Sequence, residues 1–275
     1  MPDSRIKNNR QVWEDWTYLH LETESDYQEE IWAFESGAST LSQIDLEEVG
    51  EVKDKEFLHL MCHFGVDSLS WAKRGARVTG IDFSSASISA AKHLATKHGI
   101  AADFICADVY DLPESFSGKF DLVYTEGGIL TWLPDMQAYA KAVVRCLKPG
   151  GIFYIRDSHP FRRVIFPAVL DGQGELRYYH YFSHDPTCMD MRGSYAQPNA
   201  DTHHTVYFWV HGIGEIITEL SNAGLHIEFL HEFPKVYEVF PTNIRTDQGQ
   251  FQQHNLHNWA IPSTFSLRAV LVVRC

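Results

Sequence analysis

The sequence predicts an α/β fold built around a doubly wound, mostly parallel sheet. Between residues 57 and 156, apolar segments of strand length alternate with helix-like segments of about ten to fifteen residues. Glycine-containing turns separate several of these segments. Because parallel strands joined by helices form right-handed crossovers, this alternation predicts one sheet with helices packed on it.

Each element of this pattern is assigned in order along the chain. The predicted strands cover residues 57–62, 77–82, 103–107, 120–125 and 152–156. The predicted helices cover residues 66–74, 84–97 and 135–147, and Lys148-Pro149-Gly150-Gly151 is expected to form the turn after the third. Ser84 or Ser85 caps the second helix, because a serine oxygen accepts an unpaired N–H of the first turn. A helix over 211–223 and strands over 225–231 and 265–273 follow.

Composition and charge exclude several classes of protein. The formal net charge of −13 argues against a nucleic-acid partner, which needs a basic face. No apolar stretch approaches the roughly 20 residues of a membrane span. The polar N-terminus lacks a secretory signal, so a cytoplasmic location is expected. The 15 histidines form no HExxH motif or evenly spaced His/Cys cluster, so no metal site is expected.

Polar or glycine-containing steps end four successive strands. They are the turn from His59 to Gly65, then Asp82, Asp108 and Thr125-Glu126-Gly127. Ligands of open α/β sheets bind beyond the carboxyl ends of the strands. A carboxylate at the position of Asp82 can accept hydrogen bonds from both hydroxyl groups of a ribose. A side chain at the position of Asp108 can accept a hydrogen bond from the amino group of adenine.

These motifs resemble those of class I S-adenosylmethionine (AdoMet)-dependent methyltransferases. The resemblance rests on residues 57–82, Ala107-Asp108, residues 120–124 and 147–151, and it covers residues 50–157 most strongly. It implies a seven-stranded Rossmann-like fold with a reversed strand, AdoMet as cofactor and S-adenosylhomocysteine as product. The implied cofactor-binding residues are His59, Met61, Cys62, His63, Gly65, Asp82, Phe83, Asp108, Val109, Thr125, Glu126 and Gly127.

More narrowly, the whole chain resembles a bacterial group of AdoMet-dependent methyltransferases with an Asn-Arg-x-x-Trp segment, here residues 9–13, and a Cys-His-Phe-Gly turn. Where the wider family has an acidic residue and three glycines, this chain has His59, Met61, His63 and Gly65. A Rossmann dehydrogenase is expected to keep its phosphate-cradling glycines. AdoMet has no phosphate, so the bulkier turn favours a methyltransferase over a nicotinamide-dependent oxidoreductase.

The resemblance also divides the chain, which we interpret as a single domain of residues 1–275. Residues 1–50 are expected to form a helical lid, with Trp13, Tyr18 and His20 as candidates to cover the cofactor. Residues 51–157 form the AdoMet-binding core. The aromatic-rich segments 158–210 and 233–264 are expected to be insertions that build the acceptor site, because long loops in compact domains are usually functional.

The acceptor is expected to be a small organic molecule methylated on an O or N atom. Methyl transfer depends mainly on holding the nucleophile and the methyl group in line. If a general base is used, the candidates are His159, His211 and Glu215, with Tyr181 and Tyr195 nearby in the aromatic segment. A halide or thiol methyltransferase needs no base, and a non-catalytic AdoMet-binding protein needs only the cofactor site. Both alternatives remain open, as do the acceptor and the oligomeric state.

Overall fold

A seven-stranded sheet lies at the centre of the protein, for which a computed structural model describes residues 4–22, 25–161, 181–236, 243–245, 251–253 and 262–272. The strand order is β3-β2-β1-β4-β5-β12-β8. Strands β1 to β5 are parallel, and β12 runs antiparallel between β5 and β8. The predicted mostly parallel sheet is therefore confirmed. The bounds are β1 (Glu56–Leu60), β2 (Arg77–Asp82), β3 (Asp103–Cys106), β4 (Phe120–Glu126), β5 (Leu147–Ser158), β8 (Leu225–Phe233) and β12 (Thr264–Leu271).

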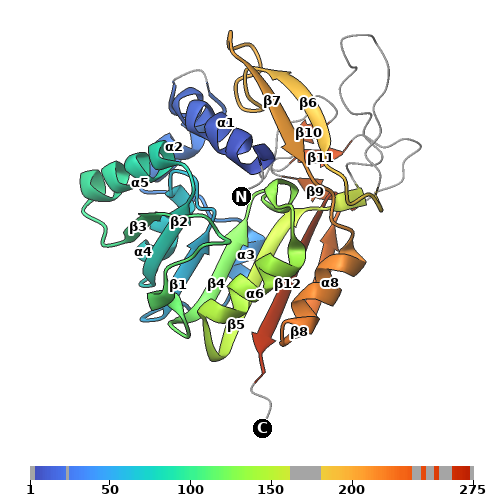
Figure 1. The fold of residues 1–275 in the computed structure, drawn as a ribbon. Coiled ribbons are helices and arrows are strands. Elements are labelled where there is room, and N and C mark those ends of the chain that lie inside the picture. The colour runs from blue at the N-terminus through green and yellow to red at the C-terminus, as the bar shows by residue number, and fades with distance from the viewer. Residues whose placement is uncertain are drawn as a thin grey trace.

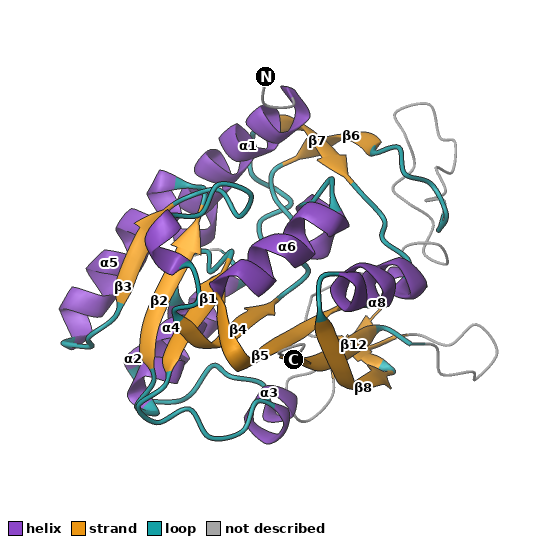
Figure 2. Ribbon diagram, turned by 60° about the horizontal axis from the view of Figure 1, so that its bottom comes forward, coloured by secondary structure: helices purple, strands orange, loops and turns teal. Residues whose placement is uncertain are grey.

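Helices cover both faces of this sheet (Figure 2). One face carries α6 (Met136–Cys146) and α8 (Ile213–Asn222); the other carries α3 (Gln43–Glu48), α4 (Val66–Lys73) and α5 (Ser85–His98). Successive side chains of a strand point to opposite faces. Phe57 of β1 accordingly packs with Trp71 of α4, whereas Leu58 packs with the α6 cluster, and both are fully buried. Burial on both faces explains why the strands are nearly continuous apolar runs.

A cap lies over the carboxyl ends of the parallel strands (Figure 1). It comprises α1 (Ser4–Leu21), α2 (Tyr27–Glu35) and the hairpin of β6 (Thr187–Arg192) and β7 (His203–Phe208). Trp16 of α1 packs with Val206 of β7. The sequence suggested no regular structure in this part of the 158–210 segment, because β6 is only half-buried and its partner strand lies more than ten residues away.

Other boundaries differ from those predicted. Residues 148–151, expected to be a turn, lie inside β5, where the pairing with β4 shifts register between Phe120 and Leu122. Within 233–264, the described residues include β9 (Lys235–Val236), β10 (Asn243–Arg245) and β11 (Phe251–Gln253), which form a small antiparallel sheet. Short 3-10 helices η1 (Glu114–Phe116) and η2 (Leu130–Trp132) flank β4. Among the described residues, no helix is long and apolar enough to span a membrane.

Candidate functional site

The turn between β1 and α4 has an alternating left-handed backbone. The φ angles of Met61, His63 and Gly65 are 57°, 51° and 76°. For a residue with a Cβ this conformation costs about 1–2 kcal/mol. A Cβ on Gly65 would also lie 2.6 Å from Cε1 of Phe104. The turn thus adopts a glycine-type conformation at three positions with a single glycine, and the surrounding contacts must stabilise it.

His59 and Cys62 attach this turn to α4 and β2. His59 is buried, and its Nδ1 lies 2.7 Å from Oγ of Ser68 in α4. Burial lowers the pKa of His59 to about 3, so the imidazole is neutral. Cys62 is also buried, and its backbone N–H donates to the carbonyl of Ile81 in β2. The His59 side chain and the Cys62 backbone therefore fix the turn between β1, β2 and α4.

Asp82 joins the end of β2 to the same turn. One carboxylate oxygen accepts the backbone N–H of His63 at 3.0 Å, and the other accepts that of Ser84 at 2.9 Å. Burial is the main cause that raises the pKa of Asp82 to about 6, although these hydrogen bonds oppose the shift. The carboxylate therefore connects the two strand ends between which a ribose is expected to bind.

Phe83 and Asp108 meet at the neighbouring strand end. Oδ1 of Asp108 accepts the backbone N–H of Tyr110 at 3.0 Å. Oδ2 lies 3.6 Å from Nη2 of Arg10, whose Cζ is 5.5 Å from the centroid of the Phe83 ring. Val109, beside Asp108, is buried. The structure thus brings the two predicted side chains together and adds Arg10 from α1, a residue of the Asn-Arg-x-x-Trp segment that was not among the predicted cofactor-binding residues.

The end of β4 carries a buried ion network. Glu126 accepts from Nη2 of Arg156 at 2.8 Å, and Nε of Arg156 donates to Asp45 at 2.7 Å. Burial, followed by the nearby Asp67 carboxyl, raises the pKa of Glu126. Thr125 is fully buried and donates to the carbonyl of Leu60 in β1. Gly127 follows with a φ of 88°. Glu126 is therefore held by an arginine of β5 that the sequence did not indicate.

Aromatic side chains of the cap close over the β1–α4 turn. Nδ1 of His20 lies 3.2 Å from Nε2 of His63, and the Trp13 ring is edge-on to His63 at 5.4 Å. Burial lowers the pKa of His20 to about 3 and also lowers that of His63, so both rings are neutral. Tyr18, by contrast, is 66% exposed, so its side chain lies largely in solvent on α1. Trp13 and His20 therefore lie against His63 in this turn.

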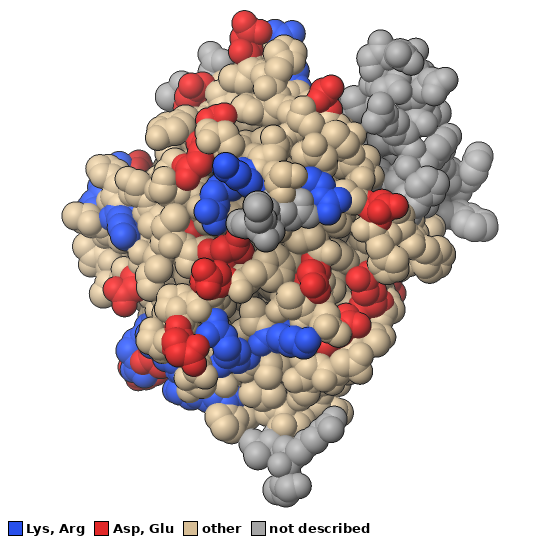
Figure 3. All heavy atoms as spheres, viewed as in Figure 1, with Lys and Arg blue, Asp and Glu red and all other residues tan. Residues whose placement is uncertain are grey.

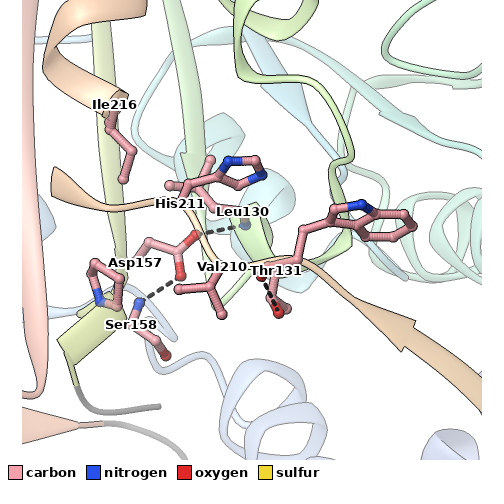
Figure 4. A pocket seen from close by; sticks show the side chains of 9 residues that line it. Leu130, Thr131, Asp157, Ser158, Val210, His211 and Ile216 are labelled. Carbon is pink, nitrogen blue, oxygen red and sulfur yellow. Dashed lines mark hydrogen bonds between the residues drawn. The ribbon is translucent and has the colours of Figure 1, made fainter. Parts of the chain in front are cut away.

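A hollow that is partly open to solvent lies beside the ends of β4 and β5 (Figure 4). Its lining consists of Leu130, Thr131, Asp157, Ser158, Pro160, Trp209, Val210, His211 and Ile216. Asp157 accepts the backbone N–H of Leu130 at 2.9 Å. Nε2 of His211 lies 2.7 Å from the carbonyl of Leu133, and its Nδ1 lies 3.1 Å from Glu215. Both nitrogens of His211 therefore face acceptors.

The other acceptor-site candidates lie outside the lining of this hollow. His159 is not among the lining residues; its Nδ1 accepts the backbone N–H of Phe161 at 3.1 Å, and its Nε2 lies 2.8 Å from Glu232. The Tyr181 hydroxyl accepts the backbone N–H of Ile213 at the start of α8. The Tyr195 hydroxyl lies 2.6 Å from that of Tyr27, within the aromatic cover. Only His211 of these candidates lines the hollow.

Comparison with known proteins connects this geometry to a family. Residues 57–151 match a family described as a methyltransferase domain. Ubiquinone biosynthesis O-methyltransferase of Chromobacterium violaceum is 30% identical over 122 residues, which are 44% of this chain and 52% of the relative. The enzyme of the same name from Idiomarina loihiensis is 37% identical over 101 residues, 36% of this chain and 41% of the relative. The chain therefore spans about half the length of the curated relatives it matches.

Solved structures extend the match beyond the core. A putative S-adenosylmethionine-dependent methyltransferase from Listeria monocytogenes has a TM-score of 0.59 at 18% identity, covering 81% of this chain and 92% of that one. The chain has the fold of class I AdoMet-dependent methyltransferases. Geranyl diphosphate C-methyltransferase from Streptomyces coelicolor A3(2), solved with S-adenosyl-L-homocysteine, has a TM-score of 0.53 at 14% identity over 82% of this chain and 76% of that one. Together, the domain match and the relatives support an enzyme with AdoMet as its cofactor.

Proposed function

We propose that this protein transfers a methyl group from AdoMet to an oxygen or nitrogen atom of a small organic molecule. The observation that carries the proposal is the turn of Met61, His63 and Gly65, held by Asp82 at the ends of β1 and β2. The left-handed turn lets the backbone approach a ligand closely, and the Asp82 carboxylate accepts from ribose hydroxyls. Two residues with a Cβ, Met61 and His63, hold a left-handed backbone in this turn, and backbone strain of this kind is common at ligand-binding sites.

The cofactor is proposed to extend along the carboxyl ends of four strands. Phe83 and Asp108 take the adenine, and the β1–α4 turn lines the methionine part. Glu126 and Thr125 lie at the methionine end, with Gly127 beside them. Trp13 and His63 exclude water above the sulfonium. The reaction needs no covalent catalyst, because the sulfonium is already activated and the displacement depends on alignment.

The hollow of Figure 4 is proposed as the acceptor site. Its lining combines apolar side chains, Trp209 and the Asp157 carboxylate, which suits a compact acceptor with a hydroxyl or amine donor. His211 faces the carbonyl of Leu133 and the carboxylate of Glu215, so we assign this pair a role in shaping the hollow. His159 stays a weaker candidate for a base, because both of its nitrogens have neighbours outside the hollow.

A small molecule fits the charge distribution better than a nucleic acid does. The chain has a formal net charge of −13. On the face drawn in Figure 3, Lys and Arg form several separate groups, at the lower left and above the centre, with acidic side chains between them. Binding to a phosphate backbone relies on a continuous basic surface.

Calorimetric titration with AdoMet, S-adenosylhomocysteine and NADH tests the cofactor assignment. We expect micromolar binding of both sulfur ligands, no binding of NADH, and loss of binding in Asp82→Ala. Asp201→Ala is the matched control, because that side chain is 94% exposed in the hairpin. Binding of NADH in place of AdoMet would overturn the proposal.

A screen of hydroxyl, amine and thiol acceptors, read out as S-adenosylhomocysteine formed, then tests the reaction. Turnover with a hydroxyl or amine supports the proposed acceptor class, and turnover with thiols or halides alone contradicts it. AdoMet binding without turnover on any class favours the alternative of a non-catalytic AdoMet-binding protein.

A further inference from the structure

One face of α1 lies directly over the start of α5. Arg10, Glu14 and Thr17 follow one another at spacings of four and three, which places them on the same side of a helix. Glu14 accepts the backbone N–H groups of Ser85 at 2.6 Å and Ala86 at 2.9 Å. Thr17 Oγ1 lies 2.7 Å from Oγ of Ser87. Two of the three side chains thus fix this face of α1 just beyond the carboxyl end of β2.

The next face of α1 is fixed independently by the hairpin. Asn9 donates to the carbonyl of Tyr207 at 2.7 Å and accepts its N–H at 3.0 Å. Asn9 is buried, as are Val12 and Trp16, which pack with β7. Neither set of contacts involves Arg10. The position of Arg10 over the ends of β2 and β3 is therefore imposed by the docking of α1 and is available to a ligand.

Arg10 places a hydrogen-bond donor next to the Asp108 acceptor. Oδ1 of Asp108 is already used by the Tyr110 N–H, and Oδ2 is the oxygen nearest to Arg10, at 3.6 Å. The Arg10 side chain is 46% exposed, and its guanidinium carries five N–H donors and no acceptor. The Phe83 ring lies beside it, 5.5 Å from Cζ. An acceptor and a donor thus stand side by side next to an aromatic face.

This arrangement is complementary to one edge of adenine. The exocyclic amino group of adenine is a donor, and the ring nitrogens on either side of it are acceptors. We propose that Arg10 reads the cofactor's adenine together with Asp108: Asp108 accepts from the amino group, and Arg10 donates to a flanking ring nitrogen. The inference rests on the proposed function and assigns to Arg10 a specificity role at the same site.

The test compares adenosine with 1-deazaadenosine and 7-deazaadenosine, each of which replaces one flanking nitrogen by carbon. Affinities are measured by calorimetry for the wild type, Arg10→Ala and Arg10→Met. We expect at least one deaza analogue to bind the wild type about five- to tenfold more weakly than adenosine, because a donor is left unpaired. In both Arg10 variants, this deaza analogue and adenosine should bind with the same affinity. Lys7→Ala, which removes a positive charge from an exposed position of the same helix, should keep the wild-type difference between them.

The two proposals fail in different ways in this experiment. If the ratio of the affinities for adenosine and each deaza analogue is the same in the wild type and in both Arg10 variants, Arg10 does not contact the adenine and this inference is wrong. The proposal that the protein binds AdoMet is then unaffected. If neither adenosine nor AdoMet binds the wild type, the cofactor assignment itself is wrong. A role of Arg10 in folding alone would weaken adenosine and its deaza analogues by the same factor, which also overturns the inference.

Discussion

The backbone N–H of His63 donates a 3.0 Å hydrogen bond to the carboxylate of Asp82. This bond joins the turn after β1 to the end of β2, and it holds His63 at a φ of 51°. The strained backbone of the turn and the buried carboxylate are therefore linked by this hydrogen bond. A change to either residue should therefore alter both the free energy of unfolding and the affinity for the cofactor.

Gly65→Ala should destabilise the protein and abolish AdoMet binding. The new Cβ would meet Phe104 at 2.6 Å in a backbone with a φ of 76°, so the expected loss is about 2–4 kcal/mol of unfolding free energy. Gly118→Ala is the matched control, because its φ is 60° and nothing lies within 4 Å of the added Cβ. The control should lose about 1 kcal/mol in urea unfolding. Equal losses in the two variants would show that the contact with Phe104 is relieved without cost.

AdoMet affinity should rise with pH through the pKa of Asp82. Ribose hydroxyls donate to the ionised carboxylate, and burial raises its pKa to about 6. At pH 5 about a tenth of the carboxylate is ionised, so binding should be about tenfold weaker than at pH 8. Asp82→Asn should remove this part of the pH dependence in calorimetry. A wild-type affinity that is flat between pH 5 and 8 would contradict the assignment.

The same pKa shift has the opposite effect on folding. The folded state holds the Asp82 proton more tightly than the unfolded state, whose pKa is near 3.8. The unfolding free energy contributed by this group therefore falls as pH rises from about 4 to about 6, and no further above that range. Asp82 is thus an ionised group kept at a cost to stability, as expected of a binding residue.

The central sheet and the strand-end residues were predictable because local sequence specifies them. Strands buried on both faces appear in the sequence as apolar runs; Asp82 ends β2, and Asp108 follows β3. The remaining features depend on contacts distant in sequence. Asn9 meets Tyr207 across 198 positions, and spacing along the chain carries no sign of that pairing. The left-handed conformation of Met61 could not be predicted either, because the turn imposes it and methionine itself does not favour it.

Arg156→Met should destabilise the fold strongly. The Arg156 and Asp45 side chains are 7% and 1% exposed, and Glu126 shares the guanidinium. Removing the cation leaves buried carboxylates without a compensating positive charge, for an expected loss of about 3–5 kcal/mol in urea unfolding at pH 8. Arg77→Met, at a pair whose arginine is 56% exposed, should lose less than about 1 kcal/mol.

The loss in Arg156→Met should shrink at low pH. The pKa of Glu126 is raised by burial and by Asp67, and burial raises the pKa of Asp67 to about 6. As pH falls toward 5 these carboxyls take up protons and no longer need a cation. A loss that stays constant between pH 5 and 8 would mean that the deleted guanidinium contributed packing and not charge compensation.

Asn9→Asp should release α1 from the hairpin. Asn9 donates to the Tyr207 carbonyl and accepts its N–H, and a carboxylate can only accept. Placing a charge against a carbonyl at a buried position should cost about 2–3 kcal/mol. Asn199→Asp, at an exposed position of the loop between β6 and β7, should change stability by less than about 0.5 kcal/mol.

Tryptophan emission separates release of α1 from a general loss of stability. Trp13 and Trp16 lie on α1, and Trp16 is fully buried against the hairpin and the aromatic cover. If Asn9 docks the helix, Asn9→Asp should shift the emission to longer wavelength under conditions where the sheet remains folded by circular dichroism. AdoMet should then bind more weakly, because Arg10 and Trp13 leave the cofactor site together. An unchanged emission spectrum with an unchanged affinity would show that the contacts of Glu14 and Thr17 hold α1 without the hairpin.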